Sequence, residues 1–493
     1  MWNIQLPPAE WYDRTTVHKI IEDVGRQKQI AIDTETTGLT VWKDIPLFWS
    51  MSWGERRMCL PADTLPMFQQ IFAEKNRQWI LANAKYDMHI LANVGIQLAG
   101  DVVDIQIQHA LLYEDEPHGL KYIANAILGW KWLDFQDTFK FRKGKKGTGE
   151  KVGDMLLRVA AENRDLLSEY ASNDAYGTYK AFEKLDQELK DTASHSLFPD
   201  LVSNLHDYFH KIEKRFTRTL WKCERRGVLV DFNYLNEREQ LLDENMADIE
   251  KQMMKEAGKL FNPDSDDDLR AYFFDHLKMA PLRMTSGGKS GQPKGSVDKA
   301  FMAYASEKGV QMATLCLRHS RLSTIKNTYL QGWRDRADPQ GRLHTRFNQD
   351  VARSGRLSSS DPNLQNVKRP DEEDIDEQDA AIDLVLRAAF VPPEGFRLLV
   401  SDYEQLEMRL LGAATVSDRY PNGEENMIAI FREKRDIHMG NAAMVFGVPY
   451  KDIEEAKGVE KQIKKGKLPE SALSAYHHQC LFYRQAAKAI GFG

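Results

Sequence analysis

The sequence predicts an α/β domain over its first 200 or so residues, followed by a mostly helical α+β region. Apolar runs of strand length alternate with helical patterns up to about residue 190, which is typical of an α/β domain. Beyond that point helical patterns dominate, with one clear strand-like run near residue 398. A chain of 493 residues has room for about three domains.

The composition is typical of a globular protein and argues against a membrane-spanning or strongly basic one. The chain is 42% hydrophobic and 28% charged, with a net charge of −6, so it is ordinary for a globular protein and not basic overall. A local basic groove can still bind nucleic acid in such a chain. The four cysteines lie far apart, which suggests reduced thiols in a cytoplasm and argues against a zinc cluster built from cysteines. No apolar run is long enough for a membrane span, so no membrane partner is expected.

The elements of the first part follow from local patterns. Residues 28–33 read as a short buried strand, and residues 80–95 as a strand end followed by a helix. Residues 161–189 predict one long helix. The basic, glycine-rich stretch 140–151 predicts a mobile loop, which either guides a single strand through phosphate contacts or is simply solvated.

The second part is punctuated by loops. Residues 205–260 predict helices broken at the segment ERRGVLVD, and helical pattern resumes up to residue 335 after a glycine-rich loop at 285–295. The acidic run 369–379 is too polar to pack and predicts a solvated loop. The segment FRLLVSDYEQLEMRLLG is expected to begin as a strand and continue as a helix, with helices again from residue 420.

In the first part of the chain, carboxylates stand at the end of a predicted strand and on predicted helices. In AIDTETTGL, Asp33 and Glu35 stand two apart at a strand end, so both point to the same side of the sheet. Asp87 lies in NAKYDMHIL, while Tyr170 and Asp174 are four apart on a predicted helix. These spacings allow one site with four carboxylates and a phenol. Each pattern alone is more often a solvated surface.

Four hard oxygen donors suit Mg²⁺ or Mn²⁺. Neighbouring carboxylates repel unless a cation lies between them. Two ions about 4 Å apart can clamp a phosphodiester, one activating water and the other stabilising the leaving oxygen.

The three segments resemble the motifs of 3′→5′ exonucleases of the Asp-Glu-Asp-Asp class, tyrosine variant. The resemblance implies a ribonuclease H-like fold and metal ligation by Asp33, Glu35, Asp87 and Asp174. It also implies that Tyr170 helps to orient the attacking water. Asn83, four residues before Asp87, is expected to bind DNA.

A second set of segments resembles consecutive motifs of family A DNA polymerases, the bacterial polymerase I and phage replicative type: SGRLSSSDPNLQN, SDYEQLEMRLLG, RDIHMGNAAMVFG and YRQAAKAIGFG. The resemblance covers nearly the whole chain, in the family's order. It implies a right-hand polymerase region with an exonuclease domain at 1–200, a thumb and the start of the polymerase region at 201–340, a partial palm at 341–415 and truncated fingers at 416–493. It also implies a location in a bacterial or phage-infected cytoplasm.

The expected roles of the second set combine chemistry and resemblance. Asp402 is expected at a strand tip, where it would bind catalytic metal, with two ions per site as in the exonuclease. Polar side chains suited to the minor groove and the primer end are expected to bind DNA: Arg356, Asn363, Gln365 and Asn366. A nucleotide triphosphate is expected to meet Gln405, Glu407, His438, Arg484, Lys488 and Phe492. Among these, Glu407 is by resemblance the gate against a ribose 2′-hydroxyl, and Phe492 offers a ring for base stacking.

The sequence departs from the family after Phe492. The family continues to a Tyr-Gly and then to a His-Asp-Glu hairpin that supplies a second metal-binding aspartate. The acidic run 369–379 does not replace it, and the triplet HDY at 206–208 lies in helical pattern and looks incidental. Synthesis is therefore expected to need a separately encoded C-terminal polymerase fragment.

Three interpretations of the sequence remain open. The first is the N-terminal portion of a DNA-directed DNA polymerase with an intact, metal-dependent proofreading exonuclease, acting on primer-template, single-stranded DNA and dNTPs. The second is a free-standing 3′→5′ exonuclease whose C-terminal half grips DNA. The third is a non-catalytic remnant that binds primer-template. Arg484, Lys488 and Phe492, spaced on one helix face, favour the first.

Overall fold

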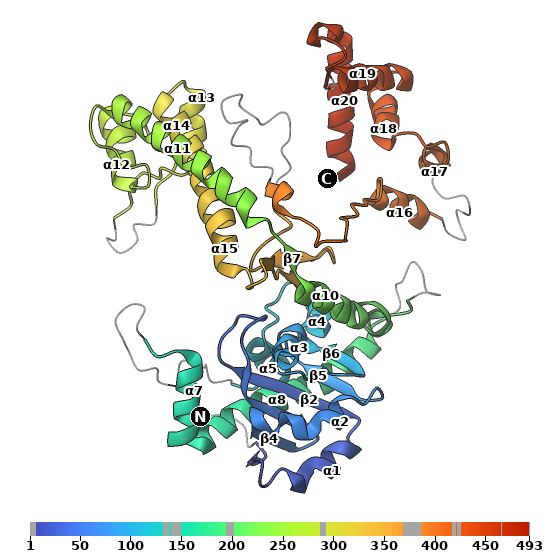
Figure 1. Cartoon of the computed structure of the whole chain (residues 1–493). Coiled ribbons are helices and arrows are strands. Elements are labelled where there is room, and N and C mark those ends of the chain that lie inside the picture. The colour runs from blue at the N-terminus through green and yellow to red at the C-terminus, as the bar shows by residue number, and fades with distance from the viewer. Residues whose placement is uncertain are drawn as a thin grey trace. The chain divides into compact units, whose positions relative to one another are not determined.

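The computed structural model describes residues 6–131, 138–139, 149–193, 202–285, 292–367, 386–416, 421, 425–464 and 466–492. The chain forms two compact units, Met1–Leu398 and Leu399–Gly493 (Figure 1). Each unit has a buried core of its own.

The first unit begins with a six-stranded mixed sheet, whose spatial order is β1-β4-β3-β2-β5-β6. The strands β2, β5 and β6 run parallel to one another, while β3 is antiparallel to both β2 and β4. Their bounds are β1 Ala9–Trp11, β2 Gln29–Thr36, β3 Pro46–Trp53, β4 Arg56–Pro61, β5 Gln78–Leu81 and β6 Asp101–Asp104.

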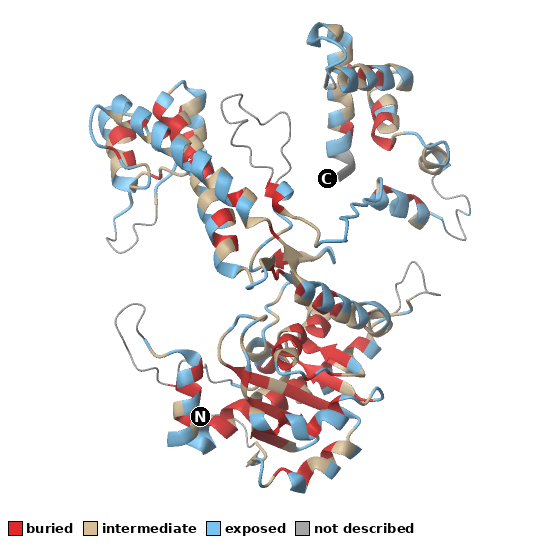
Figure 2. Ribbon diagram, in the orientation of Figure 1, coloured by how far each residue is buried: buried red, intermediate tan, exposed pale blue. Residues whose placement is uncertain are grey.

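Helices cover this sheet, and the predicted α/β domain is confirmed. Their bounds are α1 His18–Arg26, η1 Ala62–Phe68, α2 Gln69–Phe72, α3 Ala84–Asn93, α4 Ile105–Leu112, α5 Leu120–Leu128, α7 Val152–Glu162 and α8 Arg164–Asp191. Figure 2 shows that burial concentrates in the strands and in the helices beside them.

Strand β2 separates two cores because its side chains alternate between the faces of the sheet. Ile30 and Ile32 belong to a cluster that includes residues of α1 and α3. Ala31 belongs to another cluster, shared with Phe182 and Leu185 of α8. Asp33 continues the register of Ala31, so the strand directs its carboxylates toward the α8 face.

The predicted helix over 161–189 is two helices. Asn163 interrupts the pattern, and its side chain accepts a hydrogen bond of 3.1 Å from the N–H of Leu166, which caps the start of α8. The preceding helix, α7, ends at Glu162. The 28-residue helix α8 contacts the five strands β1 to β5 and carries both Tyr170 and Asp174.

The remainder of the first unit is mostly helical, as predicted, with short strands where it meets the sheet domain. Its elements are α9 Leu205–Tyr208, η2 Phe209–Glu213, α10 Lys214–Arg226, β7 Val228–Leu229, α11 Phe232–Ala257, α12 Asp266–Arg270, η3 Ala271–His276, α13 Lys299–Glu307, α14 Gln311–Thr324, η5 Ile325–Gln331, α15 Gly332–Arg336, β8 Arg342–Leu343, β9 Arg346–Asn348, β10 Ser358–Ser360 and η6 Leu386–Ala389. In α11, Leu235, Leu242, Ile249 and Met253 form one buried stripe against α14.

The second unit is helical: α16 Leu406–Ala414, α17 Glu425–Arg432, α18 Ile437–Phe446, α19 Tyr450–Lys464, η7 Glu470–Ala472 and α20 Ala475–Phe492. Small residues let α18, α19 and α20 pack closely, with Ala442, Ala456 and Ala487 buried in one cluster.

The strand predicted in FRLLVS is wrong. Residues 396–403 form no strand, and Leu399 and Val400 are 93% and 85% exposed. A strand needs a neighbour that pairs with its N–H and C=O groups, and none of the described residues pairs with this segment. Asp402 therefore does not lie at a strand tip in this structure.

Other expectations fall outside the described residues. The acidic run 369–379, most of the 140–151 loop and the centre of the 285–295 loop are among them. Within the described part of the chain, no helix is long and apolar enough to cross a membrane.

Candidate active site of the sheet domain

Three of the predicted carboxylates meet at the end of β2. Asp33 and Glu35 from the strand and Asp174 from α8 place carboxylate oxygens within 4.8 Å of one another. Helix α8 brings Asp174 to this place because its buried face packs across the sheet. Residues far apart in the sequence thus form one acidic cluster.

Asp87, on α3 at the opposite face of the sheet, is not one of the three carboxylates that lie within 4.8 Å of one another, but its charge acts on both Asp33 and Glu35. Thr34 points to that face and donates a hydrogen bond of 2.6 Å to Asp87 Oδ1. Asp104, at the end of β6, accepts from the N–H groups of Asn83 and Ala84 at 3.1 and 2.7 Å. This carboxylate therefore fixes the start of α3 and, through it, the position of Asp87.

The electrostatics of the cluster favour a bound cation. Burial raises the pKa of Asp33 well above its usual range, and repulsion from Asp87, Asp174 and Glu35 raises it further. Burial, with repulsion from Asp174 and Asp87, raises the pKa of Glu35 to about 8. Burial likewise raises the pKa of Asp87 to about 7, against the hydrogen bond from Thr34. An all-oxygen donor set of this charge fits Mg²⁺ or Mn²⁺.

Metal removal should make the stability of this domain depend on pH. A carboxyl whose folded pKa is raised binds its proton more tightly when folded. The stability that this protonated carboxyl contributes to the fold is therefore fully present below about pH 4, and it is lost as pH rises through about 7 to 8. We expect the thermal unfolding midpoint in chelator to fall between about pH 6 and about pH 9, and Mn²⁺ to restore it at the higher pH. Calorimetry with and without Mn²⁺ checks this, and a midpoint at high pH that ignores the metal would contradict it.

Tyr170 lies four residues before Asp174 on α8 and is 5% exposed. Its ring packs edge-on against Phe139, with centroids 4.8 Å apart. The predicted phenol is thus held rigidly on the helix that supplies a carboxylate.

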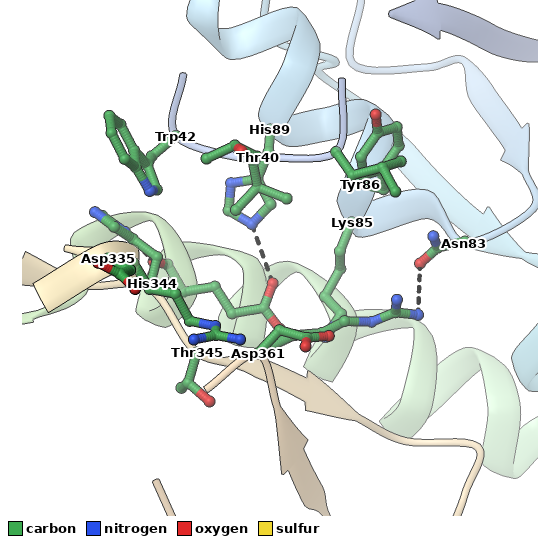
Figure 3. A pocket seen from close by; sticks show the side chains of 15 residues that line it. Thr40, Trp42, Asn83, Lys85, Tyr86, His89, Asp335, His344, Thr345 and Asp361 are labelled. Atoms are coloured by element: carbon green, nitrogen blue, oxygen red, sulfur yellow. Dashed lines mark hydrogen bonds and ion pairs between the residues drawn. The ribbon is translucent and has the colours of Figure 1, made fainter. Parts of the chain in front are cut away.

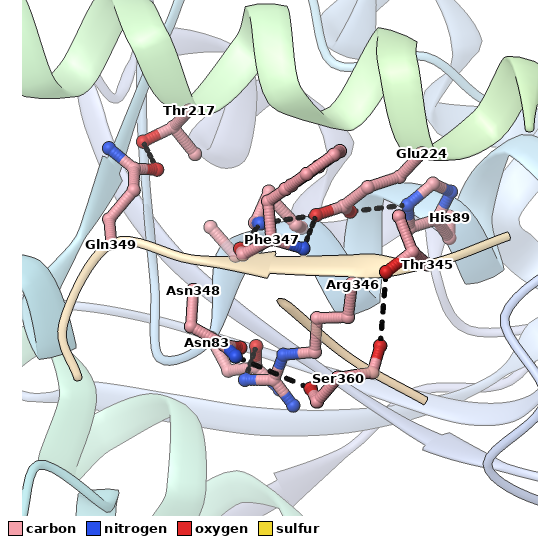
Figure 4. Close-up of polar contacts among 12 residues, drawn as sticks. Asn83, His89, Thr217, Glu224, Thr345, Arg346, Phe347, Asn348, Gln349 and Ser360 are labelled. Carbon is pink, nitrogen blue, oxygen red and sulfur yellow. Dashed lines mark hydrogen bonds and ion pairs between the residues drawn. The ribbon is translucent and has the colours of Figure 1, made fainter. Parts of the chain in front are cut away.

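A buried ion network joins α3, the helix that carries Asp87, to α10 and β9 (Figure 4). Glu224 on α10 is 3% exposed and lies 3.0 Å from His89 Nε2, and it also accepts from Lys85 Nζ. The same carboxylate accepts from the N–H of Phe347 on β9 at 2.7 Å. Burial opposes ionisation, but the bonds from His89 and Lys85 hold the pKa of Glu224 below its usual value. Sequence reasoning missed this network, whose partners lie up to 262 residues apart.

Breaking this network should destabilise the first unit. Glu224→Ala would leave the Lys85 ammonium, 9% exposed, without its buried counter-ion. We expect a loss of about 3–5 kcal/mol of unfolding free energy. Urea unfolding measures it, and Glu237→Ala, at an exposed helix position, should change stability by less than about 0.5 kcal/mol. Equal effects of the two substitutions would contradict a structural role for Glu224.

A cavity of about 510 Å³ opens beside Asn83 (Figure 3). Its walls come from the loop after β2, from α3 and from the segment before and within β9. Arg346 on β9 donates to Asn83 Oδ1 at 3.0 Å, and Trp42 stacks on His344 with centroids 6.4 Å apart. The predicted DNA-binding residue Asn83 thus has a cationic partner that the sequence alone did not reveal.

The predicted residues of the 354–366 block flank β10: Arg356 precedes the strand, and Asn363, Gln365 and Asn366 follow it. Asn363 Oδ1 accepts from Ser359 Oγ at 2.9 Å and from the N–H groups of Gln365 and Asn366 at 3.1 and 3.2 Å. It therefore shapes the turn on which its neighbours stand. Arg356, Gln365 and Asn366 are exposed.

In the second unit, Asp402 and Glu407 are exposed, and Gln405 takes the left-handed backbone conformation that starts α16, with φ of 55°. Among the described residues, two groups of three or more metal-ligating side chains occur, and neither includes Asp402.

Two of the predicted triphosphate contacts, His438 and Arg484, bond to an acidic residue that the sequence analysis did not single out. Asp436 caps α18 and accepts from Arg484 and Lys457 at 2.8 and 2.9 Å. Against the effect of burial, these bonds hold the pKa of Asp436 well below its usual range. His438, whose pKa burial lowers, feels the charges of Arg484 and Lys488. The side chain of Phe492 lies outside the described side chains.

Known proteins resemble both parts of the chain. Residues 9–190 match the 3′-5′ exonuclease family, and residues 232–466 match DNA polymerase family A. DNA polymerase I of Pseudomonas aeruginosa is 32% identical over 375 residues, which cover 75% of this chain and 36% of that protein. DNA polymerase I of Chloroflexus aurantiacus is 30% identical over 454 residues, which cover 88% of this chain and 44% of that protein.

A solved structure is similar over almost the full length. It is described as the POL domain of Pol1 from M. smegmatis in complex with DNA primer-template and dNTP, and it covers 97% of this chain and 69% of that chain. The TM-score is 0.63 at 21% sequence identity, so this likeness concerns the fold. The chain spans less than half the length of the two curated relatives.

Proposed function

Because the chain belongs to DNA polymerase family A and carries that family's 3′-5′ exonuclease domain, we propose that it removes nucleotides from the 3′ ends of DNA. The observation that carries the proposal is the partly buried carboxylate cluster at the end of β2, with Asp87 on α3 coupled to it electrostatically. The direct test is digestion of single-stranded DNA in the presence of Mg²⁺ or Mn²⁺.

The residues that would hold two ions of Mg²⁺ or Mn²⁺ are Asp33, Glu35, Asp87 and Asp174. Bound there, the ions would supply activation of water and stabilisation of the leaving oxygen. Other side chains of the protein would bind the DNA strand and position the water. Asn83 and Arg346 would hold the strand near the site, and the Tyr170 hydroxyl would orient the attacking water.

The role of Tyr170 can be separated from metal binding. Tyr170→Phe keeps the packing against Phe139 and removes only the hydroxyl. We expect cleavage to slow by about 100-fold or more, the scale of one side chain positioned for catalysis, while Mn²⁺ affinity stays unchanged. Single-turnover kinetics and calorimetric Mn²⁺ titration measure the two quantities. Lost metal affinity in Tyr170→Phe would contradict the proposed role.

We further propose that the polymerase region binds primer-template and dNTPs. The exposed Arg356, Gln365 and Asn366 would contact DNA, with Asn363 shaping their turn. Nucleotide would meet His438, Arg484 and Lys488, with Phe492 for stacking, and Asp402 would bind metal close to Gln405 and Glu407. The protein of the similar solved structure is in complex with both ligands, which supports the assignment.

The expectation of a separately encoded C-terminal fragment has no support in the comparisons. Both curated relatives are much longer than this chain. We therefore propose only that DNA synthesis requires a second metal-binding carboxylate opposite Asp402, in addition to the carboxylates of the described residues.

A further inference from the structure

A second cluster of metal-ligating side chains lies away from the carboxylate site. Asp186 is near the end of α8, and His206 and His210 lie four residues apart across α9 and η2. Their ligand atoms all fall within 4.8 Å of one another. Twelve residues of helix separate Asp174 from Asp186, a distance of about 18 Å, so the two clusters are distinct sites.

The two imidazoles aim at one oxygen. His206 Nε2 and His210 Nε2 lie 3.5 and 3.4 Å from Asp186 Oδ1. Charge-assisted N–H···O bonds are shorter, about 2.7–2.9 Å. Two ligands held tetrahedrally at about 2.0–2.1 Å from Zn²⁺ are about 3.4 Å apart. The spacing therefore fits two edges of a zinc coordination sphere better than two hydrogen bonds.

A buried amide points at the same oxygen. Gln108 on α4 is fully buried, and its Nε2 lies 3.4 Å from Asp186 Oδ1. Its Oε1 has no hydrogen-bond partner among the described residues. The two ends of an amide are interchangeable in position, so a rotated Gln108 would direct Oε1 into the cluster. An unpaired buried acceptor is costly, and a cation would satisfy it.

The two oxygens of Asp186 have different partners. Lys190 Nζ occupies the other oxygen, Oδ2, at 2.6 Å and leaves Oδ1 to the cluster.

We propose that Asp186, His206 and His210 form a Zn²⁺ site, with Gln108 Oε1 or water as the fourth ligand. Two histidines four apart on a helix with a carboxylate are a ligand set typical of zinc. The side chains are 14–28% exposed, so the ion can enter from solvent. The bound ion would tie α4 and α8 of the exonuclease domain to the first turns of the helix that leads to the polymerase region.

The test is Zn²⁺ titration of the full chain, stripped of metal, in an Asp33→Ala, Glu35→Ala background that disables the carboxylate site. We expect one Zn²⁺ per chain, bound with micromolar affinity or better, and a higher thermal unfolding midpoint with Zn²⁺. His206→Ala with His210→Ala should weaken binding about 100-fold or more. His18→Ala with His276→Ala removes the same number of imidazoles from exposed positions and should leave binding unchanged.

A further substitution keeps every ligand in place. Lys190→Ala removes the competing cation beside Asp186, so it should bind Zn²⁺ at least severalfold more tightly. A merely hydrogen-bonded cluster would not respond in this way. Undetectable Zn²⁺ binding in the parent, or the same stoichiometry and affinity in the His206, His210 variant, would overturn the proposal. Circular dichroism confirms that each variant is folded.

Discussion

Replacing Asp33 and Glu35 together by alanine is expected to abolish exonuclease activity, by about 10³-fold or more. Both side chains belong to the carboxylate cluster, and metal ions bound there would stabilise the transition state by several kcal/mol. Each 1.4 kcal/mol or so is a factor of ten in rate. The measurement is the rate of nucleotide release from single-stranded DNA at saturating Mg²⁺.

The same variant carries its own folding control. Because the two carboxylates repel each other and Asp87 in the absence of metal, their removal should raise the unfolding midpoint measured in chelator. Glu22→Ala with Glu114→Ala removes the same charge from exposed positions and should keep full activity. Digestion by the Asp33, Glu35 variant at the parental rate would show that the cluster is not the catalytic site.

Template-directed synthesis by the 493-residue chain is expected to be absent. Asp402 stands on an exposed segment without a neighbouring strand, and none of the described three-ligand clusters includes it. Phosphoryl transfer with two metal ions depends on carboxylates that hold both ions in register. Loss of one of these carboxylates raises the activation free energy by several kcal/mol. The rate of synthesis should therefore be lower by at least about 10³-fold than that of a polymerase with both carboxylates.

Primer extension on a defined template tests this expectation. The same preparation must digest single-stranded DNA, which shows that the protein is folded. Robust extension that survives Asp402→Ala would refute the assignment of Asp402 as a metal ligand. Extension that Asp402→Ala abolishes would keep that role and show that the second carboxylate is present after all.

The sequence predicted the sheet domain, and the residue pairs that β2 and α8 each contribute to the site, because these depend on local periodicity. The alternation along β2 placed Asp33 and Glu35 on one face, and the four-residue spacing on α8 placed Tyr170 beside Asp174. Both expectations follow from chain geometry alone, and the structure has both residue pairs on the predicted elements.

The rest depends on contacts between distant segments. Asp104 caps α3 across 20 residues, and Glu224 pairs with Lys85 across 139, so no local pattern could reveal either bond. The segment at 396–403 shows that a local pattern can also predict an element that does not form. An apolar run looks like a strand, but a strand forms only where a partner offers matching backbone groups. The Asp436 cluster was missed because its carboxylate looks like an ordinary helix cap.

The proposed exonuclease is tested most directly by the direction and products of digestion. A single-stranded oligonucleotide labelled at both ends with different dyes is incubated with the full chain and Mn²⁺. We expect the 3′ label to be released first, as a nucleoside 5′-monophosphate, while the 5′ label passes through a ladder of shortening products. Chelator and the Asp33→Ala, Glu35→Ala variant should both stop the reaction. Release of the 5′ label first, internal cleavage, or digestion that persists in chelator would contradict the proposed exonuclease.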